Sequence, residues 1–299
     1  MAVKIFAVHH KVCDAFRNEV FEPIQTGARF SGIDLGFLRD DVGDNIAAKN
    51  PYYGELTAWY WVLKNWLPAH PEVSHVGFCH YRRVLDVSRT GIQGHPPYAP
   101  IKWLDFEKIF NSRAYSCDAI EQEMAKYDLI VPVKDSSMSF RNNFIGNVLD
   151  QYAFVHPIDA MERCIASAVI NKLASPEAIK RILLSTGFHT CLNFVMRRDL
   201  FESLSCWMFR LLNDAFPNFD RSVDLSYNAI RAPAFVAERF FDVWLSMQDK
   251  RLRVKECLGY LIGDDPTPHD IPWYLSGVKQ WLLWRSGIKR HVPIPMPLL

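Results

Sequence analysis

Short, mostly apolar runs alternate with segments of helical periodicity along this chain, and the alternation predicts an α/β layered fold. Apolar runs at residues 4–8, 75–79, 128–133 and 190–196 indicate buried strands. Helical spacing predicts helices over residues 51–66, 101–126, 157–184, 198–212 and 237–247. Stretches rich in Gly, Pro, Asp and Asn at residues 27–50, 88–100 and 136–147 predict loops, the last suited to covering a ligand.

The helix predicted at residues 51–66 carries an acidic residue on its apolar face. Pro51 starts this helix and Pro68 ends it, and its tryptophans are expected in the core rather than on a sugar-stacking surface. Glu55 lies on the same face as the tryptophans. A carboxylate there is either a helix-capping group or a ligand contact, and the pattern leaves both readings open.

Composition excludes several functional classes. Of 299 residues, 49% are hydrophobic, enough for a large core, and a net charge of +1 argues against a nucleic-acid binder driven by bulk charge. The seven cysteines form no CxxC pair and no zinc-like spacing, which favours reduced thiols in the cytoplasm. We expect neither a signal peptide at residues 1–10 nor an apolar run near the roughly 20 residues that span a bilayer.

The strongest chemical signal is a pair of arginines at the end of a predicted strand. Residues 75–86 run from apolar side chains into His80, Tyr81, Arg82 and Arg83. Strand ends are where α/β folds bind ligands, and guanidinium groups match phosphate oxygens. A diphosphate site and a pair of structural ion pairs both remain open on this pattern.

Known catalytic signatures are absent: the sequence has no GxGxxG, GxxxxGK[ST], GxSxG, HExxH or Asp-x-Asp. If the chain binds a diphosphate, Arg82 and Arg83 rather than a metal are available to neutralise it. His9 and His10 are adjacent on a strand and point to opposite faces, so a joint metal site with His80 is not favoured. Asn193 stands in an apolar run, where a buried amide needs partners that acceptor hydroxyls would supply.

Glu238 is the main candidate for a general base. It is expected to begin an apolar helix, whose N-terminal dipole would keep it ionised for taking a proton from a sugar hydroxyl. The alternative is that Glu238 caps the helix or pairs with Arg239.

Three segments together resemble a known bacterial family. They are residues 50–61 (NPYYGELTAWYW), 76–83 (VGFCHYRR) and 237–245 (AERFFDVWL), and the first strand and residues 22–27 (EPIQTG) resemble it as well. The family is that of capsular and O-antigen polysaccharide glycosyltransferases, long catalogued as a domain of unknown function. The similarity covers about residues 3–250 and implies a GT-A-like fold with a mixed, mostly parallel sheet flanked by helices.

The resemblance also implies substrates and roles. It implies a UDP-sugar donor, UDP-galactofuranose being one candidate, and transfer to a growing glycan. The HYRR string stands where many GT-A enzymes carry an acidic metal-binding motif, which leaves the use of Mn²⁺ or Mg²⁺ open. The resemblance implies that Glu238 is the catalytic base. The residues implied to bind the donor are His9, Tyr53, Glu55, His80, Arg82 and Arg83. Those implied to bind the acceptor are Asn193 and Arg239.

We therefore expect a cytoplasmic inverting hexosyltransferase domain at residues 1–250 and a helical, Trp-rich basic extension at residues 251–299. Within the extension, residues 273–290 hold three tryptophans, four basic residues and no acid. This composition fits either peripheral contact with the inner face of the membrane, beside a lipid-linked acceptor, or a packed helix. The rival from another class is a non-catalytic nucleotide-sugar or glycan-binding module.

Overall fold

The computed structural model describes residues 2–91, 96–136, 146–217 and 227–263. The chain forms two units, which are described separately. The sheet unit comprises Met1–Val133, Cys191–Cys206 and Asp249–Thr267, and the helical unit comprises Lys134–Thr190, Trp207–Gln248 and Pro268–Leu299. Residues 273–290, for which either a peripheral membrane contact or a packed helix is expected, lie outside the described residues, as do Arg141, Asn142 and Asn143 of the predicted loop.

One nine-stranded sheet organises the described part of the sheet unit, in the order β10-β7-β11-β5-β4-β1-β2-β3 with β6 beside β11. The strands are β1 (Ala2–His9), β2 (Phe21–Gln25), β3 (Leu38–Arg39), β4 (Val73–His80), β5 (Arg83–Thr90), β6 (Tyr98–Ile101), β7 (Leu129–Pro132), β10 (Phe194–Arg197) and β11 (Val254–Ile262). The mixed α/β sheet that the sequence predicts is therefore confirmed.

The sheet is parallel on one side and closes on itself on the other. Strands β3, β2, β1 and β4 are parallel, whereas β10 runs antiparallel to both β4 and β7, and β5 runs antiparallel to both β4 and β11. Because β10 pairs with β4 as well as with β7, strands β4, β10, β7, β11 and β5 form a closed, barrel-like ring. Closure removes the sheet edge at β10.

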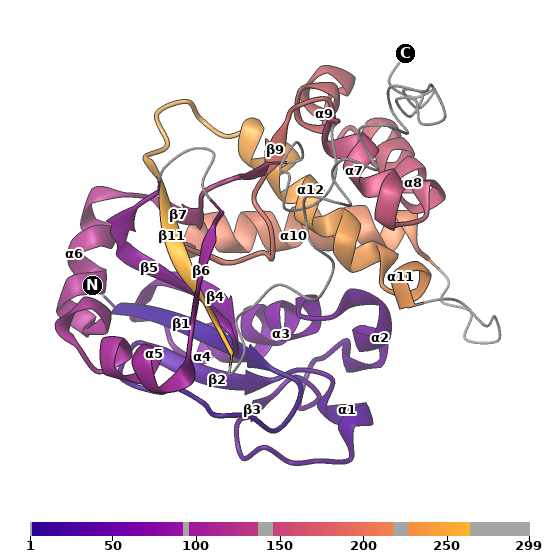
Figure 1. The fold of residues 1–299 in the computed structure, drawn as a ribbon. Helices are drawn as coiled ribbons and strands as arrows, with labels where there is room; N and C mark the ends of the chain where they lie inside the picture. The colour runs from indigo at the N-terminus through magenta and orange to yellow at the C-terminus, as the bar shows by residue number, and fades with distance from the viewer. Residues whose placement is uncertain (1, 92–95, 137–145, 218–226, 264–299) are drawn as a thin grey trace, which may run out of the picture. The chain divides into compact units, whose positions relative to one another are not determined.

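Helices cover both faces of the sheet in the sheet unit (Figure 1). On one face, odd-numbered β1 residues such as Ile5 pack with α5 (Trp103–Phe110) and α6 (Cys117–Lys126). On the other face, Phe6 contacts Trp66 edge-on, with ring centroids 5.0 Å apart, and Phe78 of β4 packs against Trp59. Successive side chains of a strand point to opposite faces of a sheet, so β1 places apolar residues on both faces, as expected for a sheet that helices cover on both sides.

The helix predicted at residues 51–66 is interrupted. The structure has α2 (Asn50–Tyr53), α3 (Leu56–Trp61), a π-helical segment (Val62–Trp66) and α4 (Leu67–Ala69). The interruption is at Gly54, whose φ of 54° and ψ of −128° strain any residue with a side chain. Trp59 is fully buried, so the core placement predicted for this stripe is confirmed.

Several other boundaries differ from the sequence prediction. The loop expected at residues 88–100 contains the end of β5 and most of β6, and residues 254–262, expected in a helical extension, form β11 of the sheet. The strand expected at residues 190–196 begins only at Phe194, because Cys191 and Leu192 have left-handed backbone angles, with φ of 69° and 48°. The described part of this unit also contains the short helix α1 (Ala28–Ser31) and two 3-10 helices, Ala47–Lys49 and Arg113–Tyr115.

The described part of the helical unit consists mainly of helices around α12 (Ala232–Ser246), which contacts α8 (Ile158–Ile170) and α9 (Pro176–Leu183) (Figure 1). The other helices are α7 (Val148–Val155), α11 (Tyr227–Ile230) and the second half of α10 (Arg198–Ala215). A short antiparallel pair, β8 (Asp135–Ser136) and β9 (Gly187–Phe188), completes it. Asn147 and Asp150 form a reciprocal capping box at the start of α7, which fixes where that helix begins.

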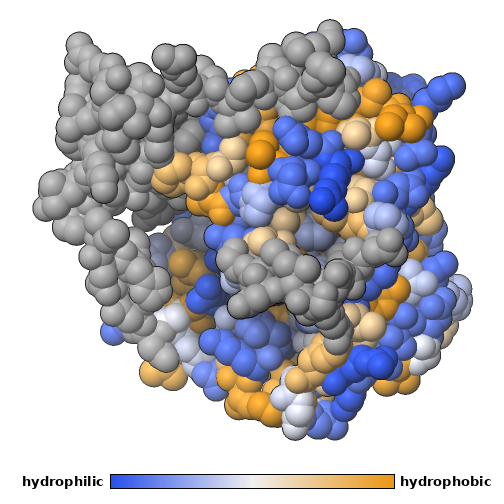
Figure 2. Space-filling model, turned by 90° about the vertical axis from the view of Figure 1, so that its right-hand side faces the viewer, coloured by the Kyte–Doolittle hydropathy of each residue, from blue (hydrophilic) through white to orange (hydrophobic). Residues whose placement is uncertain are grey.

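Within the described residues, no helix is both long enough and apolar enough for a membrane crossing. On the face of the molecule in Figure 2, hydrophobic residues lie in small groups between hydrophilic ones.

Candidate functional site

The HYRR string forms the tip of a tight β-hairpin rather than a simple strand end. His80 is the last residue of β4 and pairs with Arg83, the first residue of β5, so Tyr81 and Arg82 make the turn. Backbone hydrogen bonds hold the tip on both sides. The Tyr81 N–H donates to the Val8 carbonyl at 3.0 Å, and the Ile262 N–H donates to the Arg82 carbonyl at 2.7 Å. The tip is thus fixed beside the carboxyl end of β1, where α/β sheets bind ligands.

Basic side chains from two strand ends gather around the ring of Tyr81. Lys11 Nζ lies 5.4 Å from the ring centroid, Arg82 Cζ lies 5.8 Å from it, and the His10 ring packs edge-on at 5.2 Å. His10, Lys11 and Arg82 are exposed, and Tyr81 is half-buried. We name these four residues the hairpin-tip cluster. Its exposed cations suit an anionic ligand rather than a metal cation, and its aromatic ring suits a planar base.

His9 lies beneath this cluster and is fully buried. Burial, with a smaller effect of His10, lowers the pKa of His9 to about 4, so its ring is neutral at pH 7. Cys13 Sγ lies 3.3 Å from Nδ1, whereas Nε2 has no hydrogen-bond partner among the described residues. Because His9 is fully buried, its side chain exposes no surface in this structure for the predicted contact with a donor.

A strained turn holds the hairpin from the β10 side. The Cys191 carbonyl lies 2.6 Å from His80 Nε2, and Cys191 and Leu192 are the two consecutive left-handed residues before β10. Asn193 Nδ2 donates to the Arg83 carbonyl at 3.1 Å and to the Tyr98 hydroxyl at 2.8 Å. Such backbone strain persists only where surrounding contacts over-determine it, and it is common at functional sites.

These contacts change the interpretation of Asn193. It is 2% exposed, and its amide nitrogen serves the protein rather than an acceptor. The amide nitrogen has its partners in the Arg83 carbonyl and the Tyr98 hydroxyl, whereas the buried Oδ1 has no hydrogen-bond partner among the described residues. Asn193 precedes β10 instead of lying within it. Its contacts therefore indicate that it positions Arg83.

The NPYYGELTA string is explained by a buried hydrogen-bond network. Asp40 is fully buried and accepts hydrogen bonds from the Gly27 backbone at 2.9 Å and from Thr57 Oγ1 at 2.5 Å. Asn50 Nδ2 donates to Thr57 Oγ1 and to the Gly54 carbonyl. The polar members of the string thus connect the end of β2 to α2 and α3, and their role is to hold this edge of the sheet.

Tyr53 and Glu55 of the same string differ in exposure. Tyr53, predicted to bind the donor, is fully buried, with Lys49 Nζ 5.3 Å from its ring centroid, so it offers no surface to a ligand in this structure. Glu55 is half-buried at the N-cap of α3. This position agrees with the capping interpretation, although the side chain makes no capping hydrogen bond, and donor binding by Glu55 stays a prediction.

Glu238 does not begin a helix, contrary to the sequence prediction. The helix α12 starts at Ala232, with Pro233 in its first turn, so Glu238 is the seventh residue of the helix. Proline suits the first turn of a helix because no intrahelical N–H is needed there. At this distance the helix dipole has little effect on Glu238.

Arg239 instead provides the charge next to Glu238. Arg239 Nη1 donates to Glu238 Oε2 at 2.9 Å, and Nη2 donates to Gln151 Oε1 at 2.7 Å. The Arg239 guanidinium is almost fully buried and stacks on Phe188, with 4.3 Å to the ring centroid. Arg239 was predicted to bind the acceptor, but its burial leaves it no surface for that and makes it the residue that orients Glu238, whose side chain is 17% exposed.

One turn further along α12, a buried histidine–aspartate pair was not found from the sequence. Asp242 Oδ1 lies 2.5 Å from His189 Nδ1, and Asp242 Oδ2 accepts from the His189 backbone at 2.8 Å. Burial raises the pKa of Asp242, but the interactions with His189 outweigh it and keep that pKa below its usual value. The signal available in the sequence was the spacing of Glu238 and Asp242, four residues apart on one helix face.

The structure thus gathers six of the nine predicted residues into two groups, which leave out Tyr53, Glu55 and Asn193. His9, His80, Arg82 and Arg83 lie at the hairpin of the sheet unit, and Glu238 and Arg239 lie on α12 of the helical unit. Lys11 and Tyr81 join the first group, and Gln151, His189 and Asp242 accompany the second. Within the described residues, no group of three or more His, Cys, Asp or Glu is arranged to hold a metal ion.

An aromatic and cationic cluster at the carboxyl ends of parallel strands defines the sheet unit as an α/β unit with a candidate anion-binding site. The chain belongs to the family described as a domain of unknown function (DUF4422), whose model matches residues 4–250, which confirms the family predicted from the sequence. Among solved structures, the chain is similar to the WbbM bifunctional glycosyltransferase in its apo form, with 30% identity and a TM-score of 0.74. The match covers 88% of this chain and 46% of the WbbM chain, so this chain spans about half of that protein's length. The comparison with curated proteins finds no match.

Proposed function

We propose that this protein is a glycosyltransferase that moves a hexose, galactofuranose being one candidate, from a UDP-sugar to a growing bacterial surface polysaccharide. Membership in DUF4422 and the similarity to WbbM support the class of reaction. Because WbbM is bifunctional and this chain spans less than half of it, we propose a single transfer activity here. The capsular or O-antigen destination and a GT-A-like mode of donor binding belong to this proposal as well.

The observation that carries the proposal is the hairpin-tip cluster. Lys11 and Arg82 present exposed cations at 5.4 and 5.8 Å from the centroid of the Tyr81 ring, and Arg83 follows at the start of β5. In the proposed complex, Arg82, Arg83 and Lys11 bind the diphosphate and Tyr81 contacts the uracil. Charged hydrogen bonds of this kind stabilise the leaving UDP as its negative charge develops.

Glu238 is the proposed general base. A base must be ionised and within hydrogen-bond reach of the hydroxyl from which it takes a proton. Glu238 has a partly exposed carboxylate, which accepts a hydrogen bond from Arg239 and is oriented by it. The deprotonated acceptor oxygen would then attack the anomeric carbon, the bond from that carbon to the UDP oxygen would break, and the configuration would invert.

The decisive experiment is a screen of UDP-sugars that follows UDP release by the purified chain, without and with a glycan acceptor. Release above the buffer rate for at least one donor, increased by an acceptor, is the expected outcome. The alternative is a non-catalytic binding module, in which the cluster binds UDP-sugars and Glu238 only pairs with Arg239. Saturable UDP binding with no release for any donor would favour that alternative.

A further inference from the structure

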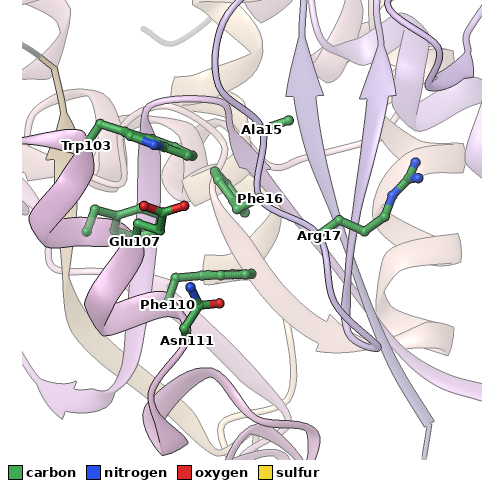
Figure 3. A pocket seen from close by; sticks show the side chains of 8 residues that line it. Ala15, Phe16, Arg17, Trp103, Glu107, Phe110 and Asn111 are labelled. Atoms are coloured by element: carbon green, nitrogen blue, oxygen red, sulfur yellow. The ribbon is translucent and has the colours of Figure 1, made fainter.

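An open cavity of about 200 Å³ lies in the sheet unit at a different set of residues from the hairpin-tip cluster. It is formed by the loop between β1 and β2 together with α5 (Figure 3). From the loop come Ala15, Phe16 and Arg17, and from the helix come Trp103, Phe106, Glu107, Phe110 and Asn111. None of these residues was singled out from the sequence.

The floor of the cavity is a rigid aromatic group. Phe16 packs against Phe106 and Phe110 with ring centroids 5.4 and 5.2 Å apart, and Trp103 packs against Phe106 at 6.0 Å. The three phenylalanines are buried, whereas Trp103 is half-buried and presents part of its indole. Because these rings support one another, the exposed indole surface is preorganised rather than mobile.

The rim carries exposed polar groups. Glu107 lies on α5 and Asn111 is the residue that caps its end, one turn further on and on the same side as Trp103, and both are exposed. Among the described residues, neither side chain has a hydrogen-bond partner. Arg17 differs, because its guanidinium donates to Glu22 at 2.7 Å and is directed away from the aromatic group in Figure 3.

We propose that this cavity binds a single sugar ring. A sugar ring has one apolar face of C–H groups, which stacks on an aromatic side chain, and a rim of hydroxyls, which need acceptors and donors. Trp103 supplies the stacking surface, the Glu107 carboxylate accepts from hydroxyls, and the Asn111 amide both donates and accepts. The volume is below the usual range for a drug-sized ligand and suits one ring.

The source of the ring is a glycan chain, a choice that rests on the proposed function. A site of this kind on the sheet unit would hold a sugar of the acceptor or product glycan that is not the reacting one. It would thereby keep the polymer attached between transfers, since a second weak contact raises the effective concentration of the chain end.

The test is saturation-transfer NMR with methyl β-galactoside and methyl β-glucoside on the full chain. At least one of these glycosides should bind saturably. Trp103→Ala should weaken the apparent affinity about tenfold, the loss expected for one aromatic stacking contact. Because Trp103→Ala removes some packing, the double variant Glu107→Ala/Asn111→Ala provides a second test on exposed positions, with a comparable loss expected.

Leu104→Ala is the matched control, because Leu104 is 68% exposed on the same helix and does not line the cavity. It should leave glycoside affinity unchanged. The proposal is overturned if neither glycoside binds, or if Trp103→Ala and the double variant both bind as the wild type does. Measuring UDP release by the same variants separates this proposal from the proposed transferase function. The expected pattern is lost glycoside binding with unchanged UDP release. If UDP release fails while glycosides still bind, only the proposed transferase function is contradicted.

Discussion

At the residue scale, the two adjacent arginines do different things. Arg82 is exposed in the hairpin turn next to Tyr81, whereas Arg83 is half-buried at the start of β5 and its carbonyl accepts from Asn193. The side chains of successive residues diverge at a turn, so both reach one diphosphate only if it lies across the tip. This geometry makes the contribution of each arginine separately measurable.

Arg82→Ala and Arg83→Ala should each weaken UDP binding by about 1.5–3 kcal/mol, the range for hydrogen bonds to charged groups. Isothermal calorimetry with UDP measures this directly. Arg89→Ala is the control, since Arg89 is an exposed arginine of the same strand that contacts Tyr260. If Arg82→Ala and Arg83→Ala are both well folded and both bind UDP with wild-type affinity, the assignment of this site to the diphosphate is wrong.

Glu238→Gln should reduce turnover by about 100-fold or more, because an amide cannot accept the proton of the attacking hydroxyl. The glutamine oxygen still accepts from Arg239, so melting temperature and UDP affinity should stay close to wild type. Glu162→Gln, at an exposed position of α8, provides a matched loss of one carboxylate. If Glu238→Gln retains activity within a few-fold of wild type, the pair with Arg239 is structural and another base must act.

At the element scale, long periodic helices and apolar strands were predicted well and their boundaries less so. The strand at residues 75–79 and the helices around 157–184 were recognisable because burial imposes a period of two or 3.6 on the sequence. The start of α12 was missed because a proline such as Pro233 is favoured in the first turn of a helix but breaks a helix in its middle. The β5–β6 region was missed because its Gly and Pro residues flank strands that need long-range partners in β11.

One helix end offers an element-scale prediction. The helix α8 ends at Ile170, and Lys172 follows with a φ of 54°, in the position where glycine is favoured after a helix. Lys172→Gly should therefore stabilise the protein by about 0.5–1 kcal/mol, since it removes the steric cost of a left-handed side chain. Urea unfolding followed by circular dichroism measures the change.

Glu162→Gly is the opposite case, because Glu162 is exposed within α8, where glycine costs about 1 kcal/mol of helix stability. A destabilising Lys172→Gly, or two variants that change stability in the same direction, would contradict the assignment of Lys172 as the helix terminator.

At the scale of the whole molecule, the sequence predicted the family and singled out the HYRR string, but it predicted neither the hairpin nor how the candidate residues divide between exposed and buried positions. His9, Tyr53, Asn193 and Arg239 were all assigned to ligands, and all four are buried. Sequence shows which residue types are present near a site, but only the packed fold shows which of them support the others. The His189–Asp242 pair illustrates the same limit, because its members are 53 residues apart along the chain.

Two histidines, His9 buried and His156 half-buried, give the molecule a pH-dependent stability. Burial is the main cause that lowers the pKa of His9 to about 4 and that of His156 to about 3, both below the ordinary value of 6.5. Hydrogen bonds from Arg253 hold the pKa of Asp128 well below its usual value. All three groups bind protons more readily in the unfolded chain, so acid favours unfolding.

The sign and the window follow from these values. The histidine contribution is fully present above pH 6.5 and is lost as the pH falls towards 4 and then 3, and the Asp128 contribution is lost only below its ordinary pKa near 3.8. The free energy of unfolding should therefore decline from pH 6.5 downward. Urea titrations at intervals between pH 7.5 and 4 measure it, and His9→Asn should reduce the slope by up to about 1.4 kcal/mol per pH unit, the limit for one proton. Equal slopes for wild type and His9→Asn would show that His9 is as readily protonated in the folded protein as in the unfolded chain.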